Sequence, residues 1–141
     1  MQVERSDFGL QSSDVGWYTG NTDVQNLRAY AKALELLPDT YVLAQQLPRS
    51  ESRLRAQLCN AAKSIFAQIA EGFAKKDSQA EFKRFLLIAL GSSDEVVTHL
   101  RQIKILRFSV DQQLCSSPMS EYESESKQIN SLIQKIKSKS I

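Results

Sequence analysis

Apolar residues recur at every third or fourth position along four segments of this chain, and this spacing restricts its fold more than any other feature. The clearest segment carries them at Leu54, Leu58, Ala61, Ala62, Ile65, Ile69 and Phe73. On a helix these side chains cover one arc about 120° wide. The arc needs an apolar surface to pack against. No stretch of the chain alternates as a strand would, so that surface must come from other helices.

Residues that typically begin and end helices set the expected ranges. Thr22-Asp23-Val24-Gln25 and Ser78-Gln79-Ala80-Glu81 fit the capping box, and Ser50 can cap the segment between them. The last helix has two possible starts, near 111 or at 117, because Ser117-Pro118 can supply a cap and a first helical residue. The helices are therefore predicted at about 23–47, 50–74, 78–108 and 111/117–138.

Short polar gaps between these segments predict an all-α, up-down four-helix bundle spanning residues 22–141. The first helix is expected to turn positions 24, 27, 31, 34, 37, 41, 44 and 47 toward the core. Pro38 and Pro118 fall inside predicted helices, where each removes a backbone hydrogen bond and would kink or break the helix. Residues 1–21 hold three of the five glycines and few apolar residues, so they are predicted to form a flexible N-terminal arm.

The composition is that of an ordinary globular protein. Of the 141 residues 42% are hydrophobic, and the longest purely apolar run, Phe85 to Leu90, is far shorter than the roughly 20 residues that a membrane span needs. No signal peptide is visible, and Cys59 and Cys115 have neither metal-ligand nor disulfide-framework spacing. We therefore expect a cytoplasmic protein with reduced thiols and no membrane partner.

The chain lacks the residue patterns that common catalytic and metal sites require. A di-iron bundle needs two Glu-x-x-His pairs, but His99 is the only histidine and Val96 precedes it by three residues. No Walker loop or nucleophile elbow is present. Gly91-Ser92-Ser93-Asp94 has the composition of a phosphate-binding loop, yet it falls in mid-helix, which favours helix packing instead. We expect no enzyme activity, metal or cofactor, and a surface or interface position for His99.

Charge is spread unevenly along the chain. Residues 49–107 carry eleven basic and six acidic residues, a net charge of +5, whereas residues 1–23 carry one basic and four acidic residues. Two interpretations of the basic residues stay open. They can neutralise the phosphates of RNA or DNA, or they can be solvated helix surface. The candidate nucleic-acid contacts are Arg49, Arg53, Lys63, Lys75, Lys76, Lys83 and Arg84.

The third predicted helix carries more apolar residues than one core stripe requires. Leu87 and Ile105 fall about 140° from the centre of its core stripe, and Ile88 and Leu106 fall about 120° away on the other side. Scattered exposed leucines are normal, but four such residues on one helix favour a subunit interface. These four side chains are therefore the candidate contacts of a homo-oligomer.

The stretch Ile69-Ala70-Glu71-Gly72 ends the second predicted helix and has the appearance of a reaction site. A helix corner is the simpler interpretation, because Gly72 can adopt the left-handed conformation that ends helices. Glu71 points away from the core stripe and can pair with Lys75 one turn later. Glu71 and Gly72 are therefore predicted to be corner residues, with Glu71 as a hydrogen-bond acceptor between helices or subunits.

The central segments resemble a known family. Leu58-Cys59-Asn60-Ala61-Ala62-Lys63-Ser64-Ile65, Ile69-Ala70-Glu71-Gly72-Phe73 and the run FKRFLLIALGS at 82–92 are similar to the four-helix-bundle proteins of the rRNA intervening-sequence family. That family's pattern runs roughly R-R-A-A-x-S-I-x-x-N-I-A-E-G, then a basic turn, then E-F-x-x-F-L-x-I-A-x-G-S. Gln68 stands where the family usually has asparagine, and Asn60 stands where it has a basic residue. The resemblance covers about residues 24–138.

The resemblance implies a small, non-enzymatic bacterial protein that assembles into a ring, commonly a homopentamer. It also implies a relationship to the accessory proteins of diversity-generating retroelements, which bind nucleic acid and a reverse transcriptase. We therefore expect an oligomeric adaptor that binds RNA or DNA through its basic residues, with a reverse transcriptase as a candidate partner. The alternative is a protein–protein interaction or scaffolding module that binds no nucleic acid.

Overall fold

The structure is a computed structural model that describes residues 23–24 and 27–139 of the chain. These residues form long helices and a short 3₁₀ segment, in the order α1 (Arg28–Gln45), η3 (Arg49–Glu51), α2 (Ser52–Ala74), α3 (Gln79–Leu106) and α4 (Gln112–Lys139). No strand occurs within these ranges, so the all-α prediction is confirmed for the described part of the chain. The predicted arm at 1–21 and the cap residues Thr22 and Gln25 lie outside the described residues.

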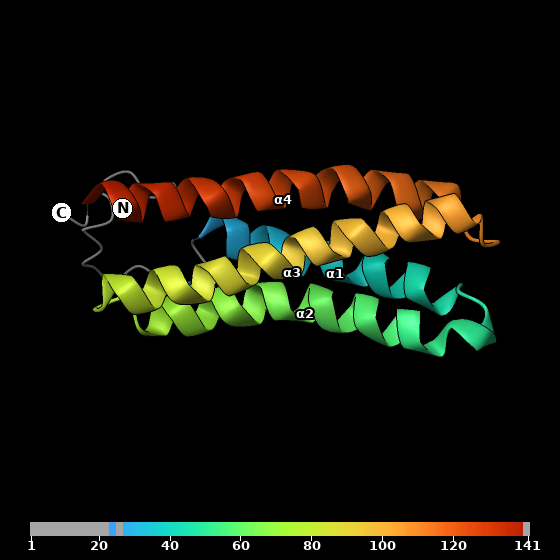
Figure 1. Ribbon diagram of the computed structural model, residues 1–141, viewed down its shortest axis with the longest axis horizontal. Coiled ribbons are helices and arrows are strands. Elements are labelled where there is room, and N and C mark those ends of the chain that lie inside the picture. The colour runs from blue at the N-terminus through green and yellow to red at the C-terminus, as the bar shows by residue number, and fades with distance from the viewer. Residues whose placement is uncertain (1–22, 25–26, 140–141) are drawn as a thin grey trace.

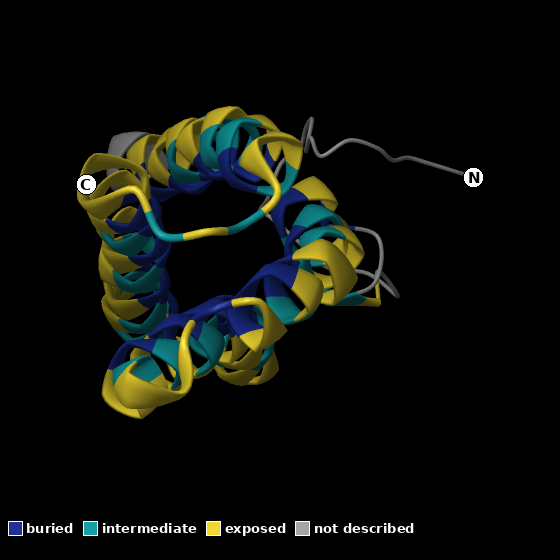
Figure 2. Cartoon of the chain, turned by 90° about the vertical axis from the view of Figure 1, so that its right-hand side faces the viewer, coloured by how far each residue is buried: buried dark blue, intermediate teal, exposed yellow. Residues whose placement is uncertain are grey.

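The four helices surround one apolar core. α2 packs against α3, α3 packs against α4, and α1 packs against both α2 and α4 (Figure 1), so α1 and α3 lie diagonally across the bundle. Figure 2 shows that the buried positions face inward along the helices and the exposed positions face outward. Tyr122 and Phe82 are among the largest fully buried side chains. None of the helices in the described part is long and apolar enough to cross a membrane.

The buried faces of α2 and α3 follow the periodicity of the sequence. All seven apolar positions of the α2 stripe are buried, from Leu54 to Phe73. At the start of α3, Ser78 Oγ accepts a hydrogen bond of 3.2 Å from the backbone N–H of Glu81, as an N-cap does. The carboxylate of Glu81 binds Arg84 instead of the Ser78 backbone, so only one half of the capping box forms. α2 itself begins with a 3₁₀ turn, and no side chain caps it.

The buried face of α1 differs from the predicted one. Ala31 and Leu34 are exposed, although the predicted stripe placed them in the core. α1 has apolar residues on two sides, so their spacing alone could not identify the buried side. Contact with α2 and α4 selects the side that carries Ala29, Ala33, Thr40, Leu43 and Ala44.

α4 begins at Gln112, next to the earlier of the two predicted starts. Asp111 Oδ1 accepts a hydrogen bond of 2.9 Å from the backbone N–H of Gln113, and so satisfies one of the free amides of the first turn. Pro118 is buried inside α4, and Pro38 is exposed inside α1. Neither proline ends its helix, since the chain continues in helical conformation on both sides.

Candidate nucleic-acid interface

The seven predicted nucleic-acid contacts are spread over the length of α2 and the start of α3. Arg49 lies in η3 just before α2, Arg53 lies at the beginning of α2, and Lys63 lies near its middle. Between Arg53 and Lys75 a helix rises about 33 Å at 1.5 Å per residue. The remaining four residues, Lys75, Lys76, Lys83 and Arg84, lie at or just after the turn that joins α2 to α3. The structure therefore divides the seven residues into two groups instead of one compact patch.

The group at the α2–α3 turn is engaged in local ion pairs. Lys75 Nζ lies 2.7 Å from Glu71 Oε2, which is the pair expected one helical turn apart. Arg84 lies 3.1 Å from Glu81, and this hydrogen bond lowers the pKa of the Glu81 carboxyl. Exposed pairs of this kind contribute little to stability, so a phosphate can compete for these cations.

Three cations at the same turn lie over aromatic rings, and the longest of these contacts places Lys75 Nζ 5.7 Å from the ring centroid of Phe85. Lys76 Nζ is 4.4 Å from the ring centroid of Phe73, and the guanidinium carbon of Arg84 is 4.4 Å from that of Phe85. Cation–π contacts at exposed sites are worth roughly 0.5–1 kcal/mol. The rings therefore hold these basic side chains close to the turn and reduce their freedom to reach a ligand.

The basic candidates in η3 and α2, at some distance from this turn, form no such contacts in the described part of the chain. Arg49, Arg53 and Lys63 are exposed, and none of them forms an ion pair within residues 23–24 and 27–139. Arg55 is a contrast, because its guanidinium donates hydrogen bonds to the carbonyl oxygens of Ala44 at 3.1 Å and of Leu47 at 2.9 Å. Arg55 thus binds the backbone at the C-terminal end of α1, whereas Arg49, Arg53 and Lys63 are available for an anionic partner.

Gly72 serves close helix packing, not a left-handed turn. It lies inside the last turn of α2, and no glycine among the described residues has a positive φ angle. A Cβ atom on Gly72 would lie 2.8 Å from the Cβ of Phe85 and 3.2 Å from the backbone oxygen of Phe82. The left-handed conformation predicted here is therefore wrong. Glycine is needed because α2 and α3 approach too closely at this point for a larger residue.

The four apolar residues predicted on the outer side of α3 are exposed. Leu87, Ile88, Ile105 and Leu106 have between 40% and 76% of their surface accessible. Gly91 lies on the same helix, and a Cβ added to it would contact no atom of the described residues within 4 Å. Close packing within the chain therefore does not explain Gly91, in contrast to Gly72.

The serines that follow Gly91 join helices. Ser92 Oγ donates to Ser64 Oγ on α2 at 2.9 Å, and the buried Ser93 Oγ donates to the backbone oxygen of Tyr122 on α4 at 3.2 Å. Ser126 Oγ donates to Asp94 Oδ1 at 2.7 Å. The segment that has the composition of a phosphate loop is thus a set of contacts between helices.

A polar layer crosses the core between α1 and α4, and the sequence analysis missed it. Thr40 Oγ1 donates to the backbone oxygen of Leu36 at 2.9 Å, so the Tyr122 hydroxyl, 2.7 Å away, must donate to Thr40. Burial raises the pKa of Tyr122 to about 12.

Glu125, one turn after Tyr122, is completely buried, and neither of its carboxylate oxygens has a hydrogen-bond partner in the described part. Burial raises the pKa of Glu125 to about 8, and the positive charge of Lys32 opposes this rise. A charged carboxylate without a partner is costly in an apolar core, so the neutral acid is favoured. Position 125 falls on the apolar stripe of the last helix. This position in the helical repeat was the sign in the sequence that Glu125 is buried.

His99 is half-buried beside Glu95, with 13% of its side chain accessible and Nε2 3.1 Å from Glu95 Oε2. Within the described ranges, no group of three or more His, Cys, Asp or Glu residues is arranged to hold a metal ion. Both cysteines are free thiols, and burial raises the pKa of each. The described part thus presents basic and apolar surfaces on an all-helical protein.

This all-helical protein can be placed in a family. Residues 25–135 match the family described as 23S rRNA-intervening sequence protein, and the chain therefore belongs to this family. The match includes α1, α2 and α3 and most of α4, so it covers both the free basic residues of α2 and the exposed apolar residues of α3. No curated protein matches the chain.

Proposed function

We propose that this protein is a non-enzymatic, oligomeric adaptor that binds RNA or DNA through basic surface residues. The observation that carries this proposal is that Arg49 in η3 and Arg53 and Lys63 in α2 are exposed and form no ion pair among the described residues. Basic side chains in this state can neutralise phosphates and release counterions, which is the main source of sequence-independent affinity for nucleic acid. Membership in a family named after 23S rRNA also supports an association with nucleic acid.

The proposal extends to a ring-shaped homo-oligomer, a pentamer, of up-down four-helix bundles. The path of colour along the helices in Figure 1 and the short connections between them support the up-down topology. Exposed apolar residues occur on two diagonal helices, with Leu87 and Ile105 on α3, and Leu34 and Val42 on α1. A ring repeats one contact between two different surfaces of each subunit. Opposite sides of a bundle can supply these two surfaces.

The proposed partner in the cell is a reverse transcriptase, which the adaptor would serve as an accessory protein. This part of the proposal rests on the resemblance to the accessory proteins of diversity-generating retroelements. Copurification of the tagged protein with a reverse transcriptase encoded beside its gene would support it. A neighbourhood without such a gene would contradict it.

Nucleic-acid binding is tested by titrating labelled RNA and DNA with the purified protein at about 50 and 200 mM salt. We expect binding that weakens steeply with salt, by about 10³-fold or more if six phosphates are contacted. The R49Q/R53Q/K63Q variant should bind more weakly and with a smaller salt dependence, while its helix content by circular dichroism stays unchanged. The absence of wild-type binding at low salt would contradict the adaptor and favour the protein-interaction module.

The oligomer is tested by light scattering. We expect a mass several times the 15.9 kDa of one chain, and a loss of the oligomer in the L87S/I105S variant, because both side chains are exposed in the single chain. Gln102→Ser, an exposed polar position of the same helix, is the matched control and should leave the mass unchanged. A monomer mass for the wild-type protein would exclude the ring.

A further inference from the structure

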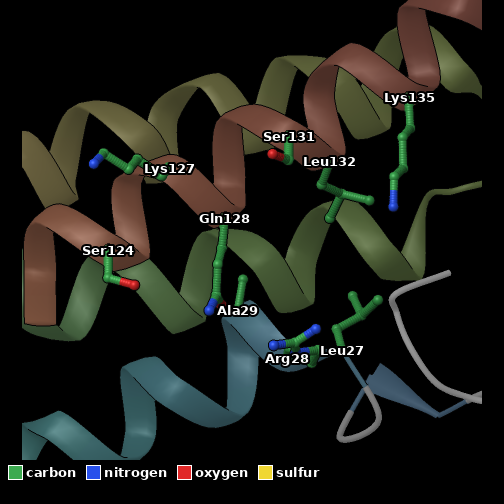
Figure 3. A pocket seen from close by; sticks show the side chains of 9 residues that line it. All are labelled: Leu27, Arg28, Ala29, Ser124, Lys127, Gln128, Ser131, Leu132 and Lys135. Carbon is green, nitrogen blue, oxygen red and sulfur yellow. The ribbon is translucent and has the colours of Figure 1, made fainter.

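A cavity of about 330 Å³ opens between the beginning of α1 and the C-terminal half of α4 (Figure 3). Three basic residues, Arg28, Lys127 and Lys135, contribute to its lining, and no acidic residue of the described part of the chain does. Leu27 and Leu132 add apolar surface. A cavity of this volume lies at the lower end of the range that small ligands occupy, roughly 300–1,000 Å³. Its charge favours an anion.

The side chains converge from both helices. In Figure 3, Gln128 and Lys135 extend from α4 toward α1, and Arg28 lies below Gln128, whereas Lys127 points away from them. Gln128 and Lys135 are seven residues apart, which is about two helical turns, so they project from the same face of α4. Arg28 and Lys135 are therefore the two cations that can act on one bound group.

Two further observations point to a ligand. Gln128 Oε1 is buried and has no hydrogen-bond partner in the described part of the chain. An amide can present either its oxygen or its NH₂ group at this position, and either one is costly to leave buried and unpaired. α1 also begins here at Arg28, and no side chain of the described residues caps its first turn after the N-cap residue Leu27, so the positive end of the helix dipole adds to the attraction for anions.

We propose that this groove binds one nucleotide unit, with its phosphate at Arg28 and Lys135 and the polar edge of its base or sugar at Gln128. Leu27 and Leu132 would contact the flat apolar part of the unit. The inference rests on the proposed nucleic-acid binding, but it assigns the principal contact to α1 and α4 instead of α2. A strand of single-stranded RNA or DNA and a free nucleotide share this chemistry, and the experiment separates them.

The experiment compares two variants that remove the same charge from different helices. R28Q/K135Q changes the groove, and R53Q/K63Q changes the exposed side of α2. The probes are fluorescein-labelled ten-nucleotide oligouridylate and oligothymidylate, titrated with the full chain at two salt concentrations, and uridine monophosphate, titrated by calorimetry. Circular dichroism and thermal melting of each variant confirm that it is folded.

We expect R28Q/K135Q to weaken binding of the oligonucleotides by roughly 10- to 100-fold and, because one phosphate contact is lost, to reduce the slope of log K against log salt by about 0.7. R53Q/K63Q should weaken binding less. If R28Q/K135Q binds as tightly as the wild type and R53Q/K63Q does not, the groove is overturned and the proposed function stands. If the wild type binds no nucleic acid, the proposed function fails. Uridine monophosphate then decides the groove: binding that R28Q/K135Q abolishes supports a free nucleotide, and no binding overturns the site.

Gln128→Leu separates a nucleotide site from a merely basic surface. This substitution leaves the charge unchanged, so the salt slope should stay at the wild-type value. Affinity for the oligonucleotides should fall about tenfold, because the hydrogen bond to the base or sugar is lost. Binding as tight as that of the wild type would overturn the assignment of Gln128 and with it the nucleotide-specific groove.

Discussion

The α2/α3 side of the bundle and the α1/α4 side are built on different principles. At the α2/α3 contact, Gly72 lets the helices approach until no methyl group would fit beside Phe85, and Phe73 packs edge-to-face on Phe82 with centroids 6.2 Å apart. At the α1/α4 contact, polar groups replace this packing. Lys32 forms an ion pair with Glu121, the Tyr122 hydroxyl donates to Thr40, and the buried Glu125 has no hydrogen-bond partner in the described part.

This difference indicates that the α2/α3 contact contributes more to the stability of the fold than the α1/α4 contact does. Close apolar packing is the main favourable term in a small helical domain, whereas a buried carboxyl and an open cavity both cost free energy. Regions of lower stability are where binding sites and moving elements are usually found. The α1/α4 side, with its basic cavity, is therefore the part of the molecule where we expect a ligand to bind.

The largest expected effect concerns Glu125 on the polar side. Its pKa is about 8 in the folded protein and near 4.5 when unfolded, so between these pH values the folded state holds a proton that the unfolded state has released. Stability should therefore fall as pH rises across this window, by as much as about 5 kcal/mol. Lys32 on α1 and Tyr122 on α4 are the ionisable neighbours that act on this site.

Glu125→Gln should remove this pH dependence, because an amide cannot ionise. Urea unfolding of the wild type and the variant at pH 5, 7 and 9 measures it. Glu123→Gln, an exposed position of the same helix, is the matched control and should keep the wild-type slope. A wild-type protein equally stable at pH 5 and pH 9 would show that Glu125 is solvated, and the contrast between the two sides would weaken.

The next effect concerns the tight packing between α2 and α3. Gly72→Ala should destabilise the protein by about 1–3 kcal/mol, because its Cβ would clash with the Cβ of Phe85 at 2.8 Å. Gly91→Ala is the control in the same bundle. No atom of the described residues lies within 4 Å of its added Cβ, so alanine should stabilise α3 by about 0.5–1 kcal/mol. Thermal or urea unfolding gives both values, and equal changes in the two variants would refute close approach at Gly72.

The smallest effect concerns the hydrogen bond that links α1 and α4. Tyr122→Phe removes the donor to Thr40 Oγ1 but leaves the bond from Thr40 to Leu36, so no donor loses its partner. We expect a loss of about 0.5–1.5 kcal/mol, measured by urea unfolding. Tyr30→Phe is the control, since the ring of Tyr30 packs edge-on to Phe66 and its hydroxyl forms no hydrogen bond within residues 23–24 and 27–139. A loss no larger than that of Tyr30→Phe would show that the polar layer contributes no specific bond.

Sequence reasoning was most successful where one face of a helix was plainly apolar. In α2 the predicted core positions are buried, and Ser78 caps α3 as its sequence indicates. It was less successful in α1, which has apolar residues on two sides, so that Leu34 was predicted to be buried and is exposed. The sequence named the seven basic candidates one by one. Their division into two groups depends on the length of α2 and on where the chain turns into α3.

By itself, the sequence determined the helical fold class, the buried faces of the central helices and the family, because all three depend on local spacing and short motifs. The tertiary structure decided which side of α1 is buried, why position 72 must be glycine, and that Glu125 lies in the core without a hydrogen-bond partner among the described residues. It also decided that Arg28 and Lys135, far apart in the chain, line one cavity. These features depend on distances between helices, and such distances arise only when side chains remote in sequence pack together.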